Sequence, residues 1–576
     1  MAIDPELGIY AGWVAHEGSF AARQSSPRVG SPSSTLLFCG ECFDTNASSG
    51  VSLSALYATQ GDRFVAELNG LFTGLLINRA RRQALLFNDR YGSERLYSYD
   101  KNGVTYFASE AKALLAVLPE LRDFDDTGLA QFLAFGSTLG GHTLFRGLKL
   151  VPGGSLWRFT PGGSVERNRY FEPAEWEALP TLSAAGFESA FADTFDQVLP
   201  AYLRSDQAVG LSLTGGLDTR MIAACMPRSV SPAVAYTYAA AGNDTLLDLR
   251  IARQVARSRG IEHQALRIGP EFIAGFPGHV DRTVYISDGC AGLLGAHELS
   301  LSEQARQLAP VRLTGNFGSE VLRSVSTFKR NGPGSELLDP VLAERVDDVV
   351  AEQHSRQVYP VTHAAFEEVP WHLGGTLAVA RSQLCFRTPY MDNRLVRLAY
   401  QAPAHLRRTP APALQLVHDH DPALAAMPTD RGVAWGDGGV FGRCRRLVAG
   451  AAFKLDYWHK EGLPDALTPI DGLLGTLARA GLLGRHKFLA YRVWLRRELA
   501  PYAAQVLADG RTRGLPFWNA AALRRVAEDH ARGRCNRLRD LHAVITLEAA
   551  HRLLLDASAY PEPAVGTEEP TPCPTS

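Results

Sequence analysis

The sequence predicts two domains, an α+β domain at the N-terminus and an α/β domain that has a parallel sheet and a helical C-terminal part. Residues 36–159 carry short apolar runs broken by Gly, Asn and Asp, a pattern typical of successive strands and hairpins. After Pro161 the apolar residues recur at intervals of three and four, which indicates helices. The 576 residues suffice for about two to four domains of roughly 150 residues each, and the change of pattern predicts a boundary within 165–185.

Four segments of the first domain have the apolar alternation of strands, and they cover residues 34–43, 64–80, 82–92 and 95–109. The last segment contains Lys101-Asn102-Gly103, and Asn-Gly is the pair that best favours a tight hairpin turn. We therefore expect a β-rich first domain of successive strands and hairpins.

Strands and helices alternate in the second domain. The predicted strands lie at residues 208–213, 233–241 and 311–315, and the helices that lie between them cover 221–225, 248–260 and 299–308. Strands that alternate with helices form a parallel sheet, whose ligand site lies at the carboxyl ends of the strands. The last residues, 557–576, are rich in Pro, Thr and Glu and are expected to be a disordered tail.

Charge and composition exclude several classes of protein. Lys and Arg number 59 against 60 Asp and Glu, so bulk electrostatics gives no attraction for nucleic acid. The N-terminus has acidic residues where a signal peptide needs basic ones, and no apolar run reaches the ~18 residues of a membrane helix. Eight cysteines are too few for a disulfide scaffold. We expect a soluble, cytoplasmic protein that binds neither nucleic acid nor membrane.

A glycine-containing turn follows the first strand of the second domain. Residues 214–219 read T-G-G-L-D-T and open a helix. Glycines let the backbone approach an anion, and a helix N-terminus offers unpaired N–H groups and a positive dipole, so the turn suits pyrophosphate. It lacks the Gly-Lys-Ser/Thr of the ordinary P-loop. A tight strand-to-helix turn without a ligand is the alternative.

Several segments, in order, resemble the glutamine-dependent asparagine synthetase family, which includes β-lactam synthetases and lasso-peptide cyclases. In the first domain they are residues 68–99, with D-R-Y-G at 89–92 for the family's D-R-F-G, 105–115, and the linking segment 144–159. In the second domain they are the loop at 214–219 for S-G-G-x-D-S, the helix at 247–266, and R-T-P-Y-M-D at 387–392 for R-x-P-F-L-D. The resemblance extends over nearly the whole chain to about residue 555.

The resemblance implies a fold for each domain. Residues 1–165 would form a degenerate glutaminase-like domain, an Ntn-hydrolase-like β-sandwich. Residues 185–556 would form an ATP-pyrophosphatase domain of the adenine nucleotide α-hydrolase type, which makes amides in this family.

The resemblance also implies chemistry that uses ATP and Mg²⁺. A carboxylate attacks the α-phosphorus of ATP to give an acyl adenylate and pyrophosphate, and an amine then displaces AMP. Asp218 would be the carboxylate that holds Mg²⁺, and a helix N-cap is its alternative role. The residues that would bind ATP or pyrophosphate are Leu211, Leu213, Thr214, Gly215, Gly216, Leu217, Asp218, Thr219, Thr314 and Gly315.

The first domain departs from the family at the glutaminase residues. Ala2 stands where the family has its catalytic Cys after the initiator Met, and Cys39-Gly40-Glu41 stands for N-G-E. Without an N-terminal thiolate there is no acyl-enzyme route from glutamine to ammonia. Cys39 and Cys42 form a lone C-x-x-C whose thiols would lie on opposite strand faces, so strand cysteines are favoured over a redox or zinc pair.

The second domain departs at charged positions. Residues 314–320 match S-G-E-G-S-D-E, but Asn316 and Ser319 replace two functional carboxylates, which leaves Glu320 as a substitute. No lysine occurs between residues 330 and 453, where the family has its charge-stabilising lysine; Arg431 is the replacement, or else an exposed arginine. Cys385 is expected to be a packed helix cysteine. Asp392 would cap the next helix, or serve with Glu320 as a candidate base.

These residues predict an ATP-dependent amide-forming ligase without glutaminase activity. Its substrates would be a small-molecule or peptide carboxylate and an amine, as in natural-product biosynthesis by peptide macrocyclisation, where both groups lie in one molecule. One alternative is a degenerate nucleotide-binding scaffold; another is a true asparagine synthetase that uses ammonia. ATP-dependent tRNA-modifying enzymes with similar loops fit less well, because the chain is nearly neutral. A homodimer or a pathway protein is the expected protein partner.

Overall fold

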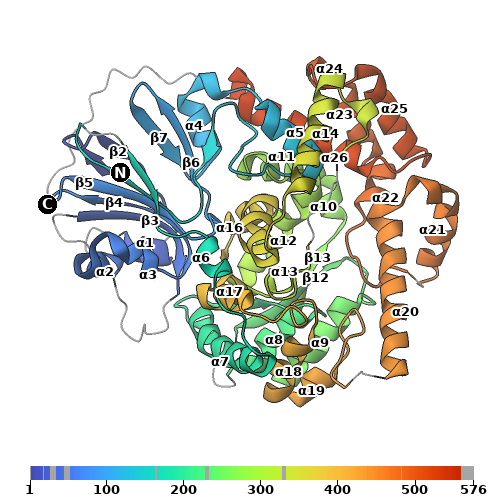
Figure 1. The fold of residues 1–576 in the computed structure, drawn as a ribbon. Helices are drawn as coiled ribbons and strands as arrows, with labels where there is room; N and C mark the ends of the chain where they lie inside the picture. Colours follow the sequence, from blue (N-terminus) through green and yellow to red (C-terminus); the bar gives the residue numbers. More distant parts are fainter. Residues whose placement is uncertain are drawn as a thin grey trace.

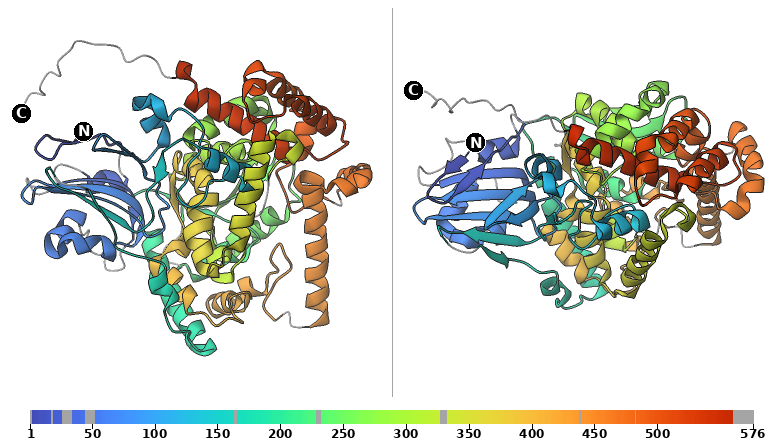
Figure 2. Two further views of the ribbon diagram at one scale, coloured as in Figure 1. Left: turned by 45° about the horizontal axis from the view of Figure 1, so that its top comes forward. Right: turned by 90° about the horizontal axis from the view of Figure 1, so that it is seen from above.

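The computed structural model describes residues 2–16, 19–25, 34–43, 52–162, 165–227, 232–326, 332–436, 439–481 and 483–559. Figure 1 shows the first-domain strands (blue) on one side of the molecule and the helix-covered second domain on the other. The two further views show the same side-by-side arrangement (Figure 2). The predicted fold class is confirmed: an α+β domain precedes a parallel-sheet domain, and the C-terminal part is helical.

The first domain contains antiparallel sheets. The larger one has the order β10-β9-β5-β4-β3, with β3 at Ser34–Cys42, β4 at Gly70–Asn78, β5 at Gln83–Asn88, β9 at Ser155–Phe159 and β10 at Glu166–Arg169. The smaller one has the order β7-β6-β8, with β6 at Tyr97–Lys101, β7 at Val104–Ala108 and β8 at Lys149–Leu150. β1 at Ala2–Asp4 pairs with β2 at Ile9–Ala11. β10 carries the larger sheet past the predicted domain limit at residue 165.

The predicted hairpin at Asn102-Gly103 is confirmed, because it joins β6 to β7 and both residues have positive φ (52° and 77°). Every residue of β4 is buried, since apolar clusters cover both faces of its sheet. One cluster includes residues of the short helices α1 (Phe20–Gln24), α2 (Leu53–Gln60) and α3 (Phe64–Glu67).

The second domain is organised around a five-stranded parallel sheet of order β13-β12-β11-β14-β15. The strands are β11 at Val209–Ser212, β12 at Val234–Ala240, β13 at His263–Ile268, β14 at Val311–Thr314 and β15 at Cys385–Arg387. The sequence predicted the first, second and fourth of these. The assignment of Cys385 to a helix was wrong: it opens edge strand β15, whose three residues are too short to show a period.

Helices cover this sheet and build the rest of the chain. Those of the first 326 residues are α4 Ala111–Val117, α5 Asp126–Phe135, α6 Ala174–Glu177, α7 Ala184–Leu203, α8 Leu217–Cys225, α9 Leu247–Arg259, α10 Pro270–Ala274, α11 Phe276–Ile286, α12 Ala296–Leu308 and α13 Gly318–Arg323. The later ones are α14 Pro340–Ser355, α15 Pro360–Thr362, α16 Gly374–Arg381, α17 Asn393–Tyr400, α18 Ala411–His420, α19 Pro422–Ala426, α20 Val440–Tyr457, α21 Asp471–Arg479, α22 Tyr491–Arg496, α23 Ala500–Ala508, α24 Gly510–Gly514, α25 Ala520–Ala531 and α26 Leu538–Ala550.

The two domains share one apolar core. A single cluster of buried side chains runs from Leu71 and Phe132 in the first domain to Leu211 and Leu313 in the parallel sheet. Helix α4 begins against the second domain, where the Asp288 carboxylate accepts the N–H groups of its first two residues at 2.8 and 3.1 Å. Because these contacts cross the boundary, the first domain cannot leave the second without exposing the core.

The predicted disordered tail falls largely outside the described residues. Ala557–Ala559 form a 3-10 turn, and residues 560–576 are not described. Among the helices of the described ranges, none combines the length and the apolar character that crossing a bilayer requires.

Candidate functional site

The predicted pyrophosphate loop, residues 214–219, lies at the carboxyl end of β11, the central strand of the parallel sheet. Thr219 fixes its shape: the Thr219 hydroxyl accepts the Thr214 N–H at 3.2 Å and lies 3.1 Å from the Thr214 hydroxyl. Leu211 and Leu213 are fully buried beneath it. Gly216 is the N-cap of α8 and no side chain caps it, so the role of N-cap considered for Asp218 was wrong. The N–H groups of the first turn, which starts at Leu217, therefore face a site without a protein cap.

A carboxylate from the next helix already contacts this loop. Asp248 in the first turn of α9 accepts the Gly215 N–H at 3.0 Å. A β-carbon at Gly215 would lie 2.9 Å from Asp248 Oδ1, so a larger residue there would displace the Asp248 carboxylate. Burial, reinforced by the nearby Asp430 carboxylate, raises the pKa of Asp248 to about 6.

The second predicted loop, residues 314–320, lies beside the first. Thr314 ends β14, which pairs with β11, and Gly315 packs against Thr219, whose nitrogen a β-carbon would approach to 2.6 Å. Phe317 is buried with φ of 74°, a left-handed conformation that costs energy for a bulky side chain. Eight of the ten residues predicted to bind ATP or pyrophosphate therefore lie in these two loops at the carboxyl ends of β11 and β14, whereas Leu211 and Leu213 are buried beneath them.

Asp218 is held by a residue that the sequence analysis did not single out. Arg323, the last residue of α13, donates from Nη1 to Oδ1 at 2.7 Å and from Nη2 to Oδ2 at 2.9 Å. Both side chains are only 15% exposed. Ser319 has no carboxylate to offer and donates its hydroxyl to Glu320 at 3.0 Å. These residues do not fit a magnesium ion shared between positions 218 and 319, because one carboxylate is missing and a guanidinium engages both oxygens of the other.

Arg431 is brought to the phosphate loop by its neighbours. Arg220, fully buried in α8, donates to the carbonyls of Leu424 and Pro428 at 3.3 Å. The Asp430 N–H donates to the Gly215 carbonyl at 3.2 Å. Arg431 itself pairs with Asp430 at 3.2 Å, lies over the Phe453 ring and is 49% exposed. Its backbone thus follows a residue that is bonded to the loop, while its predicted role in stabilising charge stays a prediction.

The structure also places a lysine near this edge. The Lys487 ammonium pairs with Glu461 at 3.3 Å, and its charge offsets a small part of the rise that burial causes in the pKa of Asp248. Its segment is tied to α9, because the Leu247 N–H donates to the Arg485 carbonyl at 2.7 Å. Sequence alignment could not find it, since it lies far beyond the aligned stretch. Its one signal was scarcity: the chain has only seven lysines.

A cavity of about 890 Å³ opens beside Lys487. Its walls come from α5 of the first domain, the start of α12, the segment 457–465 and α26. Three histidines line it, and burial lowers the pKa of each, so they are neutral near pH 7: His297, His372 and His542. The charged lining residues are two cations and two carboxylates, Lys487, Arg539, Glu461 and Asp465, so their formal charges balance.

The residues at the family's glutaminase positions, Ala2, Cys39 and Glu41, have other surroundings in this structure. Ala2 is buried, and burial raises the pKa of the Cys39 thiol to about 11, so it is protonated near neutral pH. Cys39 and Cys42 line separate cavities of about 490 and 610 Å³, as expected for opposite strand faces. Glu41 forms a two-pronged ion pair with Arg387 across the domain boundary, at 2.8 and 2.7 Å.

We define the bridging segment as residues 387–393, which contain the predicted R-T-P-Y-M-D motif. On the first-domain side, Asn69 donates to Asp392 at 2.7 Å and accepts the Asn393 N–H at 2.9 Å. Asp392 is also the N-cap of α17, as predicted. On the second-domain side, Tyr390 donates to the Asp218 carbonyl and Thr388 to the Asn316 carbonyl, both at 2.7 Å. The segment thus joins the first domain to both loops.

Comparison with known proteins agrees with this architecture. Residues 34–171 match the model of the glutamine amidotransferase domain, and residues 190–370 match that of asparagine synthase. Glutamine-hydrolysing asparagine synthetase 1 of Bacillus subtilis is 26% identical over 232 residues, which is 40% of this chain and 36% of that protein. The glutamine-hydrolysing asparagine synthetase of Cricetulus griseus is 29% identical over 245 residues, 40% of each chain. The chain thus spans about two fifths of the length of these relatives.

Among solved structures, glutamine phosphoribosylpyrophosphate amidotransferase from B. subtilis is similar at 13% identity. The similarity covers 41% of this chain and 47% of that one with a TM-score of 0.17, too low to support a structural argument.

The ion pair between Glu41 and Arg387 should contribute to stability. Glu41→Gln leaves the buried Arg387 guanidinium without its counter-charge, and we expect the free energy of unfolding to fall by about 3 kcal/mol in denaturant titrations. Glu166→Gln, which breaks an exposed pair with Arg158, is the control and should cost less than about 1 kcal/mol. Equal losses in the two variants would contradict a buried interdomain pair.

Asp248 should make stability depend on pH. Its pKa is about 6 in the folded protein against 3.8 for the ordinary side chain, so the folded state binds the proton more tightly. The stability it contributes is complete below pH 4 and is lost as pH rises through 6, a change of up to about 3 kcal/mol. Asp248→Asn should therefore gain stability relative to the wild type between pH 4 and pH 7, as measured by denaturation at each pH. A constant difference would show an unshifted carboxyl.

Proposed function

Because the chain belongs to the asparagine synthetase family, we propose that it is an ATP-dependent carbon–nitrogen ligase that joins a carboxylate to an amine and releases AMP and pyrophosphate. The observation that carries the proposal is the N-terminus of α8 at the carboxyl end of the parallel sheet, where Arg323 pairs with Asp218 of the first turn. A helix N-terminus with nearby cations is suited to an anion such as pyrophosphate.

In the first step a carboxylate oxygen attacks the α-phosphorus of ATP, the bond to the β-phosphate breaks, and pyrophosphate leaves. Negative charge builds on the leaving group, so fixed cations and N–H groups that face it lower the barrier. The first turn of α8 supplies N–H groups, and Arg323, Arg431 and Lys487 supply positive charge. Arg220 has a positioning role, since it ties the loop that carries Arg431 to the phosphate loop.

In the second step an amine attacks the acyl carbon and AMP leaves. We propose that the amine does not come from glutamine in this chain. Ala2 offers no thiol, the Cys39 thiol keeps its proton near neutral pH, and Glu41 is committed to Arg387. A second substrate, the same molecule or free ammonia would supply the amine instead.

The cavity beside Lys487 supports a sizeable acyl substrate. At about 890 Å³ it lies in the upper part of the range usual for sites that enclose drug-sized ligands. Its neutral histidines and apolar walls favour a peptide segment or another weakly charged molecule over free aspartate. Ring closure within one peptide would need no separate amine site, which is why macrocyclisation is the version of the activity that we favour.

One observation favours a second candidate function, a nucleotide-binding scaffold without catalysis. Asp218 is bound by Arg323, and Ser319 and Asn316 lack the carboxylates that the family motif carries. Such a protein would bind ATP and release no pyrophosphate with any carboxylate.

A pyrophosphate-release screen tests the proposal. We expect AMP and pyrophosphate from ATP with at least one peptide or small-molecule carboxylate, and no glutamate from glutamine; aspartate with ammonia is included as the test of a true asparagine synthetase. Lys487→Met should lower turnover by about 10²-fold, the loss typical when one charge-stabilising group is removed. Lys454→Met, at an exposed lysine of α20, is the control. ADP as the product would rule the ligase out, and binding without turnover would favour the scaffold.

A further inference from the structure

We propose that the Arg323 guanidinium takes the place of a protein-held metal ion, so that this site binds pyrophosphate through Arg323, which Asp218 orients, without a metal between positions 218 and 319. The inference rests on the proposed function, because it concerns the same pyrophosphate site. It goes further by naming the cation.

The Asp218–Arg323 contact has the geometry of a built site. Two parallel N–H···O bonds of 2.7 and 2.9 Å join the guanidinium fork to the carboxylate, and both side chains are largely buried. Gly318 closes another side of the carboxylate, since a β-carbon there would lie 2.7 Å from Asp218 Cγ. The carboxylate is therefore fixed in place by the same short helix, α13, that supplies the guanidinium.

Ser319 supports the replacement of a metal ion by the Arg323 guanidinium. A metal at this position needs oxygen ligands from more than one group, but Ser319 presents a hydroxyl that donates to Glu320. One negative charge is absent at residue 319 and one positive charge is present at Arg323. Glu320 and Asp218 remain, and Arg323 pairs with Asp218, so an anionic ligand meets one carboxylate fewer at position 319 than in the S-G-E-G-S-D-E motif.

A guanidinium can perform this role while it stays bound to Asp218. It has five N–H donors, and two of them serve Asp218, so others remain for phosphate oxygens. Asp218 lies in the first turn of α8, beside the N–H groups that the helix leaves open. Asp218 then acts as a positioning residue, because it orients the fork of Arg323 toward the loop.

Calorimetry with inorganic pyrophosphate tests the inference. We expect the wild type to bind pyrophosphate in EDTA with an affinity within about 10-fold of that in Mg²⁺. Arg323→Met should weaken binding in EDTA by at least about 30-fold, and Mg²⁺ should restore part of it, because Asp218 is then free. Arg323→Lys should keep part of the metal-free binding. Arg250→Met, at an exposed arginine of α9, should change nothing.

Two outcomes overturn the inference, and they differ in what else they affect. Pyrophosphate binding that requires Mg²⁺ in the wild type and is unchanged in Arg323→Met overturns it alone and leaves the ligase intact. No pyrophosphate binding under either condition overturns the proposed function as well. Thermal unfolding of each variant shows whether a loss of binding reflects misfolding. If Arg323→Met misfolds, pyrophosphate binding by Arg323→Lys is the test.

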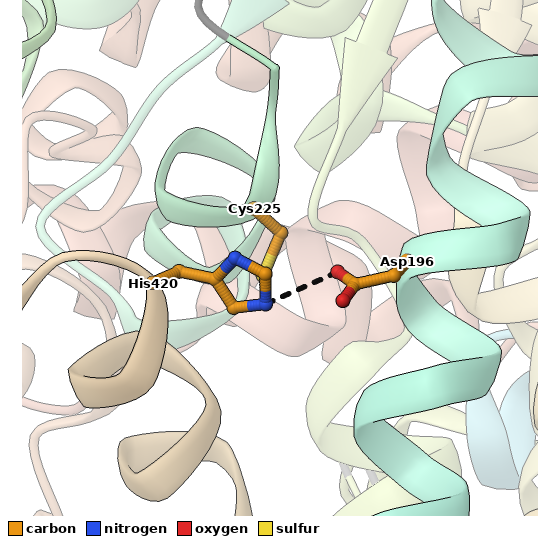
Figure 3. Close-up of side chains that lie close together, drawn as sticks. All are labelled: Asp196, Cys225 and His420. Atoms are coloured by element: carbon orange, nitrogen blue, oxygen red, sulfur yellow. Dashed lines mark ion pairs between the residues drawn. The ribbon is translucent and has the colours of Figure 1, made fainter.

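A separate cluster carries a second inference. Asp196 of α7, Cys225 at the end of α8 and His420 at the end of α18 point toward one another, with ligand atoms within 4.8 Å of each other (Figure 3). We propose that these three side chains bind a Zn²⁺-like transition metal, with water as the fourth ligand. Thiolate, imidazole and carboxylate are ligands that zinc takes in proteins, usually four in a tetrahedron.

The surroundings agree with such a site. His420 Nε2 lies 3.1 Å from Asp196 Oδ1, so two of the ligands are already oriented together. Cys225 is buried, whereas Asp196 and His420 are exposed, which leaves an open side for entry and for water. The metal would join the helix that follows the phosphate loop to the helix pair that precedes residues 428–432. By linking these helices it would restrict the motion of the loops at residues 214–219 and 428–432.

Titration of the full chain with Co²⁺ and Zn²⁺ tests this site. We expect one equivalent to bind, with a thiolate-to-cobalt charge-transfer band in the near ultraviolet that Zn²⁺ abolishes. Cys225→Ser should remove the band and weaken Zn²⁺ binding by at least about 10-fold, and His420→Ala should weaken it as well. Cys444→Ser, at an exposed cysteine, is the control. Wild-type affinity in Cys225→Ser, or no stoichiometric binding in the wild type, would overturn the inference.

Discussion

The ion pair between Glu41 and Arg387 is the contact on which the arrangement of the two domains most depends. It begins the bridging segment at residues 387–393, which then reaches the phosphate loop through Tyr390 and the Asn316 loop through Thr388. A buried pair of opposite charges is costly to break, because either partner alone would remain desolvated. The first domain therefore helps to hold the loops at residues 214–219 and 314–320 in place, whatever its own chemistry.

The charged residues around the loops at residues 214–219 and 314–320 differ from those of the family motifs. Carboxylates are missing at Asn316 and Ser319, and the aligned lysine is missing too, yet Arg323, Arg431 and Lys487 gather near the same loops. Guanidinium and ammonium groups can neutralise phosphate without a metal ion. An arginine can in addition donate two parallel hydrogen bonds to phosphate oxygens, because its guanidinium is planar and rigid. The pattern is a change in the source of positive charge, with the sheet and the loops retained.

Local features of the sequence predicted a large part of this structure. The Asn102-Gly103 hairpin, the loop at residues 214–219, the helix cap at Asp392 and the opposite faces of Cys39 and Cys42 all follow from neighbouring residues. Strands β13 and β15 were missed, because edge strands of mixed burial lack a clear period. Arg323 and Lys487 were missed since nothing near them in sequence marks what they approach.

The sequence by itself determined the order of the domains, the strand-to-helix turn at residues 214–219 and the hairpin at Asn102-Gly103, because each depends on residue identity and short-range spacing. Only the tertiary structure decided that Arg323 holds Asp218, that Glu41 holds Arg387, and that the Arg485 carbonyl accepts the Leu247 N–H at the start of α9. These partners are separated by more than a hundred residues along the chain, and charges select one another by distance in space. The folded core sets those distances, and no local pattern records them.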